Sequence, residues 1–265
     1  MAAEQPFGTP DNRLEHRLYI GWRACDDLQD IRRCGLPLQR LLRLVEQPSV
    51  LDGDHGLVGE GAQQLDVTNI LGLEEAARDF VARHGAPDLV IANAGVGVGT
   101  HSDVIADIEK LRRVLDINVT GLAASLAAFA PAMRKAGRGT LAGIASVAGF
   151  RGLAGNGAYC ASKAAAITWL ESLRTELYGS GVSVVCVCPG YIDTPMTRVN
   201  RYRMPFLLPP DEAARRIARV IAARRRLAVI PWQMAAVSVL LRAMPGWLYD
   251  RLAARAPRKP RDVQL

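Results

Sequence analysis

The sequence predicts an α/β protein built on a doubly wound parallel sheet within a single domain. From about residue 60 onward, short runs rich in β-branched residues alternate with longer segments of helical spacing. Several of these short runs are almost entirely apolar, as expected of strands whose two faces are both covered by helices. Apolar residues make up 49% of the 265 residues and charged residues 22%, which suits a globular domain with a large core.

The expected elements alternate regularly along this part of the chain. Strands are predicted at Gln64–Val67, Asp88–Ala92, Thr140–Ala145, Val182–Cys188 and Leu227–Ile230. Helices are predicted at Leu73–His84, Ile108–Lys135, Ala158–Tyr178 and Pro210–Arg224. The longest helix is expected to be interrupted near Asn118–Thr120. Functional sites in such sheets lie beyond the carboxyl ends of the strands.

The first sixty residues do not follow this order, so we divide the chain into an atypical segment, 1–60, and a regular region, 61–265. Arg17–Trp22 is a candidate first strand, and Cys25–Val45 is a candidate helix interrupted by a glycine and a proline. Ser49–Gly61 is expected to be a loop. No clean succession of strand, glycine-rich turn and helix is present in this segment.

Cysteine and histidine usage argues against disulfide frameworks and metal sites. The five cysteines form no CxxC pair, and the four histidines lack metal-ligand spacing. A cytoplasmic location is therefore expected. The apolar stretch Leu227–Tyr249 contains two prolines and an arginine, which argues against a membrane span, and peripheral membrane contact is the weaker alternative.

The net charge of +7 is unevenly distributed. Residues 198–265 hold fifteen Lys/Arg and four Asp/Glu, a local balance of +11. A basic region can attract anionic partners. Because no nucleic-acid-binding motif accompanies the charge, we expect no nucleic-acid partner and interpret Arg224, Arg225, Arg226 and the Arg255–Arg261 cluster as solvated.

The chemistry is concentrated around Tyr159 and Lys163. Residues four apart on a helix share one face, and an ammonium beside a phenol favours the phenolate. The pair is therefore a usable proton donor and acceptor, although the spacing alone is common by chance. Ser146 stands thirteen residues before Tyr159, at the end of a buried strand, where its hydroxyl could hold a substrate oxygen.

Five motifs occur in order from Asp66 to Leu265, and together they resemble the short-chain dehydrogenase/reductase family. They are Asn93-Ala94-Gly95, Asn118, Ser146, Tyr159-x-x-x-Lys163 and Pro189-Gly190. The resemblance implies a Rossmann-like fold. It also implies an NAD(P)-dependent oxidoreductase that moves a hydride between a nicotinamide and a carbonyl or alcohol.

The same resemblance implies a role for each matching residue. Tyr159 is expected to be the general acid in reduction and the base in oxidation, with Ser146 polarising the substrate oxygen. Lys163 is expected to lower the pKa of Tyr159 and bind the nicotinamide ribose, and Asn118 to hold a water of a proton relay. Further cofactor contacts are expected from Asp66, Val67, Asn93, Ala94 and Gly95 on the adenosine side, and from Pro189, Gly190, Ile192 and Thr194 on the nicotinamide side. Asn93 has an alternative role in holding strands together, and Thr194 in opening a helix.

The sequence departs from the family at the glycine-rich turn expected to bind the pyrophosphate near Asn12–Trp22. Only Gly21 is available there, and the Gly56–Gly61 glycines come too late in the chain. Either the first quarter has diverged and weakened the cofactor site, or residues 1–60 derive from a misassigned start or a shifted reading frame, which we favour. The departure removes the evidence that separates NAD from NADP. It also leaves open a non-catalytic, scaffold-like member of the family.

The segment Met196–Leu208 is expected to form a lid over a hydrophobic substrate pocket, because of its apolar and aromatic side chains, which include Val199, Tyr202, Met204, Phe206, Leu207 and Leu208. Ordinary helix packing is the alternative. Trp232, Met234, Trp247 and Tyr249 are candidates for closing the pocket, binding a membrane surface or forming a subunit contact. The resemblance implies a homodimer or homotetramer formed through the helices of Asn118 and Tyr159, where Ala123–Ala132 and Ala161–Ala166 are rich in small residues.

Overall fold

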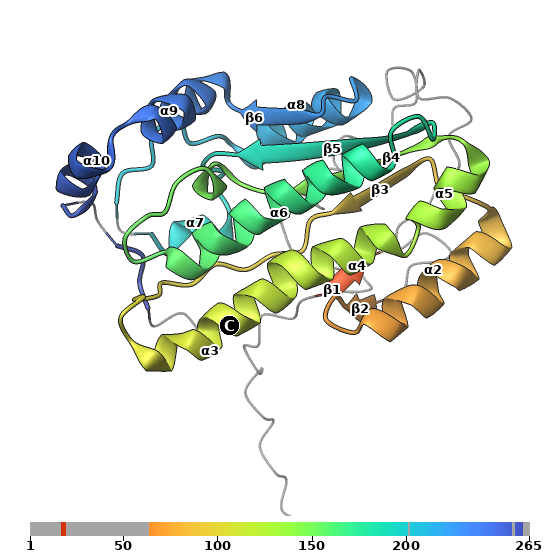
Figure 1. The fold of residues 1–265 in the computed structure, drawn as a ribbon, viewed down its shortest axis with the longest axis horizontal. Helices are drawn as coiled ribbons and strands as arrows, with labels where there is room; N and C mark the ends of the chain where they lie inside the picture. The colour runs from red at the N-terminus through yellow and green to blue at the C-terminus, as the bar shows by residue number, and fades with distance from the viewer. Residues whose placement is uncertain (1–16, 20–63, 201, 256–257, 262–265) are drawn as a thin grey trace, which may run out of the picture.

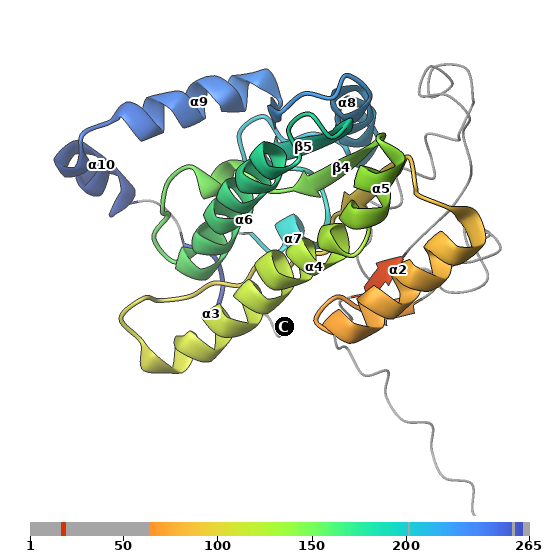
Figure 2. The same ribbon diagram turned by 45° about the vertical axis from the view of Figure 1, so that its right-hand side comes forward.

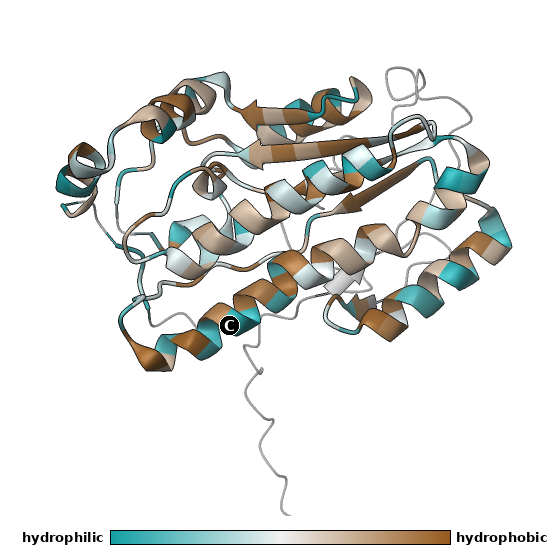
Figure 3. Cartoon of the chain, in the orientation of Figure 1, coloured by the Kyte–Doolittle hydropathy of each residue, from teal (hydrophilic) through white to brown (hydrophobic). Residues whose placement is uncertain are grey.

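A computed structural model describes residues 17–19, 64–200, 202–255 and 258–261 of the chain. Four parallel strands form its main sheet in the order β3 (Leu89–Ala92), β4 (Gly139–Ile144), β5 (Val182–Pro189) and β6 (Leu227–Ile230). These strands match the predictions to within two residues at each end. Their apolar composition is explained by burial, since every residue of β4 is buried. In Figure 3 the hydrophobic colour predominates along these strands.

Helices cover both faces of this sheet, so the predicted doubly wound α/β architecture is confirmed (Figures 1 and 2). Alternate strand residues divide between the two cores. Leu141 and Val184 pack with α4 (Leu122–Ala127), α5 (Ala130–Ala136) and α6 (Gly157–Glu176). Ala142 and Val185 pack on the other face, against α8 (Pro210–Ala222).

The predicted long helix is one continuous run with an irregular centre. It begins with a short 3-10 turn, η2 (Ile105–Asp107), and α3 (Ile108–Leu115), which leads into a π-helical segment, η3 (Asp116–Gly121), and then α4. The interruption predicted near Asn118–Thr120 is confirmed, and π-helical turns of this kind are frequent at functional sites. By length and apolar composition alone, Ile105–Ala136 could cross a membrane. However, it packs against α6, β3 and β4, as the core helix of a globular domain does.

The first predicted strand of the regular region differs from expectation. β2 (Gln64–Asp66) pairs antiparallel with β1 (Arg17–Tyr19), and the two strands form a separate two-stranded sheet. β1 lies within Arg17–Trp22, the candidate first strand of the chain. The prediction that Gln64–Val67 joins the parallel sheet is therefore wrong for the described residues. Three-residue strands carry too little hydrophobic pattern to specify their partner. The candidate helix at Cys25–Val45 and the loop at Ser49–Gly61 lie outside the described residues.

The remaining elements connect and follow the sheet. α2 (Ile70–His84) starts at Asn69, whose side chain accepts a hydrogen bond from the backbone N–H of Gly72 at 3.0 Å. Two short helical turns, η4 (Val147–Gly149) and α7 (Pro195–Arg198), follow β4 and β5. Beyond β6 come α9 (Trp232–Ala243) and α10 (Gly246–Ala253), which lie toward the edge of the sheet at which the strand arrows point (Figure 1).

Candidate active site

The parallel strands bring three of the predicted motifs to one edge of the sheet. β3 ends at Ala92 and leads directly into Asn93-Ala94-Gly95, β4 leads to Ser146, and β5 ends at Pro189. The register pairs Ile144 with Val187, so that Ser146 and Pro189 leave the sheet side by side. The carboxyl edge of a parallel sheet is where ligands bind in doubly wound folds.

Ser146 and Tyr159 form the centre of this edge. Ser146 is 8% exposed, and its hydroxyl accepts a hydrogen bond from the backbone N–H of Ala148 at 3.2 Å, which starts η4. The same hydroxyl lies 3.5 Å from the carbonyl oxygen of Pro189. Burial raises the pKa of Tyr159, and the nearby side chain of Ser146 offsets part of the rise.

Lys163 lies one helical turn beyond Tyr159 on α6, as the spacing predicts. Its ammonium is 5.8 Å from the centroid of the Tyr159 ring and donates a hydrogen bond to the carbonyl oxygen of Ile144 at 2.9 Å. Because the side chain is only 4% exposed, burial lowers the pKa of Lys163 to about 8. The pKa of Tyr159 is raised above its ordinary value in this structure, mainly by burial, so the expected lowering of that pKa by Lys163 stays a prediction.

Asn118 is fully buried and holds the loop after β3 against α6. Its side-chain oxygen accepts a hydrogen bond from the backbone N–H of Val96 at 2.8 Å. Its amide donates to the carbonyl oxygen of Val96 at 2.8 Å and to the hydroxyl of Ser162 at 2.9 Å. Asn118 is therefore a positioning residue for the edge that carries Gly95 and Lys163. Its part in a proton relay stays a prediction.

Asn93, Ala94 and Gly95, predicted to contact the adenosine side of a cofactor, lie at the sheet edge beside Lys163 and leave room for such a group. A Cβ atom added to Gly95 would lie 3.2 Å from the side-chain oxygen of Asn118 and 3.3 Å from the ammonium of Lys163, so glycine keeps this space open. Asn93, Ala94 and Gly95 are half-buried at the same edge. A nicotinamide ribose held here would contact Tyr159 and Lys163.

The predicted adenine-side pair divides into one exposed and one buried residue. Asp66 is exposed, and its carboxylate accepts hydrogen bonds from the backbone N–H and the hydroxyl of Thr68, both at 2.8 Å. Val67 is fully buried in a core cluster under the π-helical segment. The site of the missing glycine-rich turn, residues 12–16 and 20–22, lies outside the described residues.

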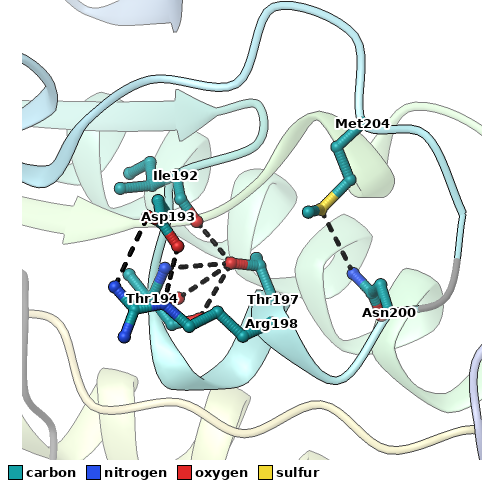
Figure 4. Close-up of polar contacts among 7 residues, drawn as sticks. All are labelled: Ile192, Asp193, Thr194, Thr197, Arg198, Asn200 and Met204. Carbon is teal, nitrogen blue, oxygen red and sulfur yellow. Dashed lines mark hydrogen bonds and ion pairs between the residues drawn. The ribbon is translucent and has the colours of Figure 1, made fainter.

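The segment after β5 folds back toward the sheet edge. Thr194 caps α7, which confirms that it opens a helix, and the hydroxyl of Thr197 donates to the carbonyl oxygens of Ile192 and Thr194 (Figure 4). An ion pair between Asp193 and Arg198, at 2.8 Å, closes the same turn. These contacts fix the backbone at Ile192, where the nicotinamide contact is predicted.

The segment 196–208, predicted to form a lid, is only partly buried. Phe206 and Leu207 are 47% and 41% exposed, and Leu208 forms a β-bridge with Ile192. Near the C-terminus, Met234 is buried against Gly190, whereas Trp232 and Trp247 are more than 70% exposed. Met234 thus packs at the site edge, and the two tryptophans form part of the surface.

One group of residues at this edge was missed by sequence reasoning. Lys259 is 9% exposed and its ammonium lies 5.7 Å from the centroid of the Tyr159 ring. Arg261 forms an ion pair with the buried Asp107 at 3.0 Å. The interpretation of the Arg255–Arg261 cluster as solvated is therefore wrong for these two residues, whereas Arg224, Arg225 and Arg226 are exposed as expected. The sequence separation of more than 150 residues between Asp107 and Arg261 left no local signal.

Comparisons with known proteins agree with this geometry. Residues 60–204 match the family model for short chain dehydrogenase. An uncharacterized oxidoreductase of Myxococcus xanthus is 42% identical over 192 residues, which is 72% of this chain and 76% of that protein. Estradiol 17-beta-dehydrogenase 11 of Pongo abelii is 30% identical over 74% of this chain and 64% of its own length. Several other relatives are longer proteins, of which the chain spans 24% to 54%.

A solved structure shows the same fold. A short chain dehydrogenase from Burkholderia cenocepacia in complex with NADP superposes with a TM-score of 0.61 at 28% identity, over 73% of this chain and 77% of that one. The family model alone spans more than half of the chain. The chain therefore belongs to the short-chain dehydrogenase/reductase family, a family of NAD(P)-dependent oxidoreductases that act on CH–OH and C=O groups.

Proposed function

We propose that this chain transfers a hydride between the nicotinamide of NAD or NADP and the carbonyl or alcohol carbon of a lipophilic substrate. The observation that carries the proposal is the placement of Ser146 near Tyr159 at the carboxyl edge of the sheet, with the Lys163 ammonium 5.8 Å from the centroid of the tyrosine ring. A bound nicotinamide would supply or accept the hydride. The apolar side chains of 196–208 favour a lipophilic substrate, as does the similarity to a protein named for the steroid estradiol.

The residues present can manage the proton that accompanies this hydride. In reduction, the Tyr159 hydroxyl donates its proton to the carbonyl oxygen, and in oxidation the phenolate takes a proton from the alcohol. Ser146 donates a hydrogen bond to the same oxygen as negative charge develops on it. Burial disfavours the Tyr159 phenolate. The positive charge of the nearby Lys163 ammonium would stabilise this phenolate when the tyrosine gives up its proton.

A two-stage experiment tests this function. Purified protein is titrated with NADH and NADPH while the cofactor fluorescence is recorded, and then assayed with a panel of alcohols and ketones. We expect Tyr159→Phe to lower kcat/KM by about 100- to 10,000-fold with cofactor binding retained. Tyr178→Phe serves as the matched control, because Tyr178 is 86% exposed. Equal activity of Tyr159→Phe and wild type would refute the assignment.

The absence of a glycine-rich turn in the sequence favours a second candidate, a non-catalytic binding or scaffold protein that keeps Asn118, Ser146, Tyr159 and Lys163. The cofactor titration separates the two. If the protein binds neither NADH nor NADPH, the oxidoreductase function is rejected for this chain and the scaffold function is left. Binding of NADH, NADPH or both would reject the idea that the missing glycine-rich turn abolishes cofactor binding. The two affinities would also give the preference between NAD and NADP.

The proposed setting is a cytoplasmic homodimer or homotetramer that takes a small-molecule substrate and binds no nucleic acid. Small side chains on α4 and α6 support the assembly, since Ala127 and Ala161 are exposed and allow close helix approach. Sedimentation analysis tests it, and a monomer at micromolar concentration would contradict it. The exposed tryptophans of α9 and α10 leave peripheral membrane contact as the weaker alternative.

A further inference from the structure

Residues 258–261 lie across the carboxyl edge of the sheet, beside the catalytic pair. Figure 1 shows this segment running from α10 toward α3 along the side of the molecule at which the strand arrows point. Lys259 is the buried residue of the segment, with 9% of its surface exposed. Its ammonium lies 5.7 Å from the centroid of the Tyr159 ring, so a second cation besides Lys163 faces the catalytic tyrosine.

Three independent contacts fix this segment in place. The backbone N–H of Gly99 donates to the carbonyl oxygen of Pro260 at 3.0 Å. The guanidinium of Arg261 binds both carboxylate oxygens of Asp107, each at 3.0 Å. Lys110 donates to the carbonyl oxygen of Arg261 at 3.2 Å. The position of Lys259 is therefore determined by contacts of the two residues that follow it, Pro260 and Arg261.

The loop after β3 is shaped to receive the segment. A Cβ atom on Gly99 would lie 2.4 Å from the carbonyl oxygens of both Lys259 and Pro260, closer than any side chain can approach. A Cβ atom on Gly97 would lie 3.0 Å from the Lys259 ammonium and 3.1 Å from Cδ2 of Tyr159. The two glycines thus let the lysine enter the space next to the tyrosine ring.

The ammonium of Lys259 has no anionic partner among the described residues. No hydrogen bond or ion pair joins it to any of them, and its contact with the site is with the face of the Tyr159 ring. Asp107, the buried carboxylate of this region, already binds Arg261, Lys110 and the backbone N–H of His101. Burial lowers the pKa of Lys259 to about 8, so the side chain is mostly protonated at neutral pH.

Burial of the Lys259 side chain without a counter-charge disfavours its charged form, and a bound anion relieves this cost. We propose that Lys259 binds the carboxylate of the substrate, so that the substrate is an oxo acid or the matching hydroxy acid. The reacting carbon, held at the Tyr159 hydroxyl, would lie a few bonds from the acid group, because the ammonium and the hydroxyl border the same ring. This inference rests on the proposed function and adds the substrate class to it.

The test compares acids with their neutral esters in the wild type, Lys259→Met and the control Arg258→Met. Arg258 lies in the same segment and is exposed, so its removal changes the net charge equally. The substrates are 2-oxo, 3-oxo and 4-oxo acids of equal chain length and their methyl esters, assayed with the cofactor that binds. We expect wild type and Arg258→Met to prefer one of the acids in kcat/KM by about 10- to 100-fold, and Lys259→Met to lose that preference with ester turnover retained.

Two results in this assay overturn the proposal while the oxidoreductase function stands. One is an acid-to-ester ratio of kcat/KM that is the same in wild type and in Lys259→Met. The other is a loss of NADH or NADPH affinity in Lys259→Met without substrate, since the anion would then be a cofactor phosphate.

If no carbonyl compound is turned over, the proposed function fails and calorimetry still decides the role of Lys259. Decanoate and 1-decanol are titrated into wild type and Lys259→Met. Binding of decanoate that is tighter than that of 1-decanol and depends on Lys259 supports the carboxylate site. Equal binding by both proteins, or no binding, rejects it.

Discussion

Lys163→Met removes the lysine beside Tyr159 and is expected to make the protein more stable. Burial lowers the pKa of Lys163 from 10.5 to about 8, so carrying its charge into the fold costs about 3 kcal/mol at neutral pH. Methionine has similar length and no charge, but it loses the hydrogen bond to Ile144, which is worth about 1 kcal/mol. The free energy of unfolding should therefore rise by about 2 kcal/mol at pH 7, and Tm by about 4 to 8 °C.

The pH dependence identifies the cause of this gain. Between pH 8 and pH 10.5 the unfolded chain keeps the lysine proton and the folded chain releases it, so wild-type stability rises with pH relative to the variant. Urea unfolding followed by circular dichroism at pH 7 and pH 10 measures the difference, which should shrink at pH 10. Lys135→Met, at an exposed position, is the control. A variant less stable than wild type at pH 7, or a difference independent of pH, would refute the reasoning.

Three further predictions concern the contacts that hold the site edge. Gly99→Ala forces a methyl group against the backbone of residues 258–261, and should lower stability by about 1 to 3 kcal/mol and speed amide exchange in that segment; unchanged exchange would contradict the packing. Asn118→Ala leaves the buried N–H and C=O of Val96 unpaired and should cost about 2 to 4 kcal/mol in urea unfolding; a cost below about 1 kcal/mol would show that water replaces the amide. Asp107→Asn loses its charge-assisted contacts and should lower Tm at pH 7. The arginine partner and a backbone N–H hold the pKa of the Asp107 carboxyl well below its usual range, so the stabilisation exists above about pH 4 and disappears as the pH falls through the folded-state pKa. A Tm difference between wild type and Asp107→Asn that persists in strong acid would refute this prediction.

The regular region of the chain could be predicted because its patterns are local. The apolar runs of β4 and β5 specify strands covered on both faces, and the helical spacing of α6 sets Tyr159 and Lys163 on one side. The strand ends then place Ser146 and Pro189 together at one edge. The short strand β2 could not be assigned a partner, because three residues carry no pattern that distinguishes parallel from antiparallel pairing.

The sequence by itself therefore determined the fold class, the family motifs and which residues are proposed as the acid–base pair, all of which follow from local periodicity and short motifs. Only the tertiary structure decided how burial changes the site. It showed that burial raises the pKa of Tyr159 and that Asn118 clamps the loop at Val96. It also showed that Lys259 lies beside the tyrosine ring. These facts depend on which distant segments pack together, and the pairing of Asp107 with Arg261 leaves no trace in the spacing of either residue.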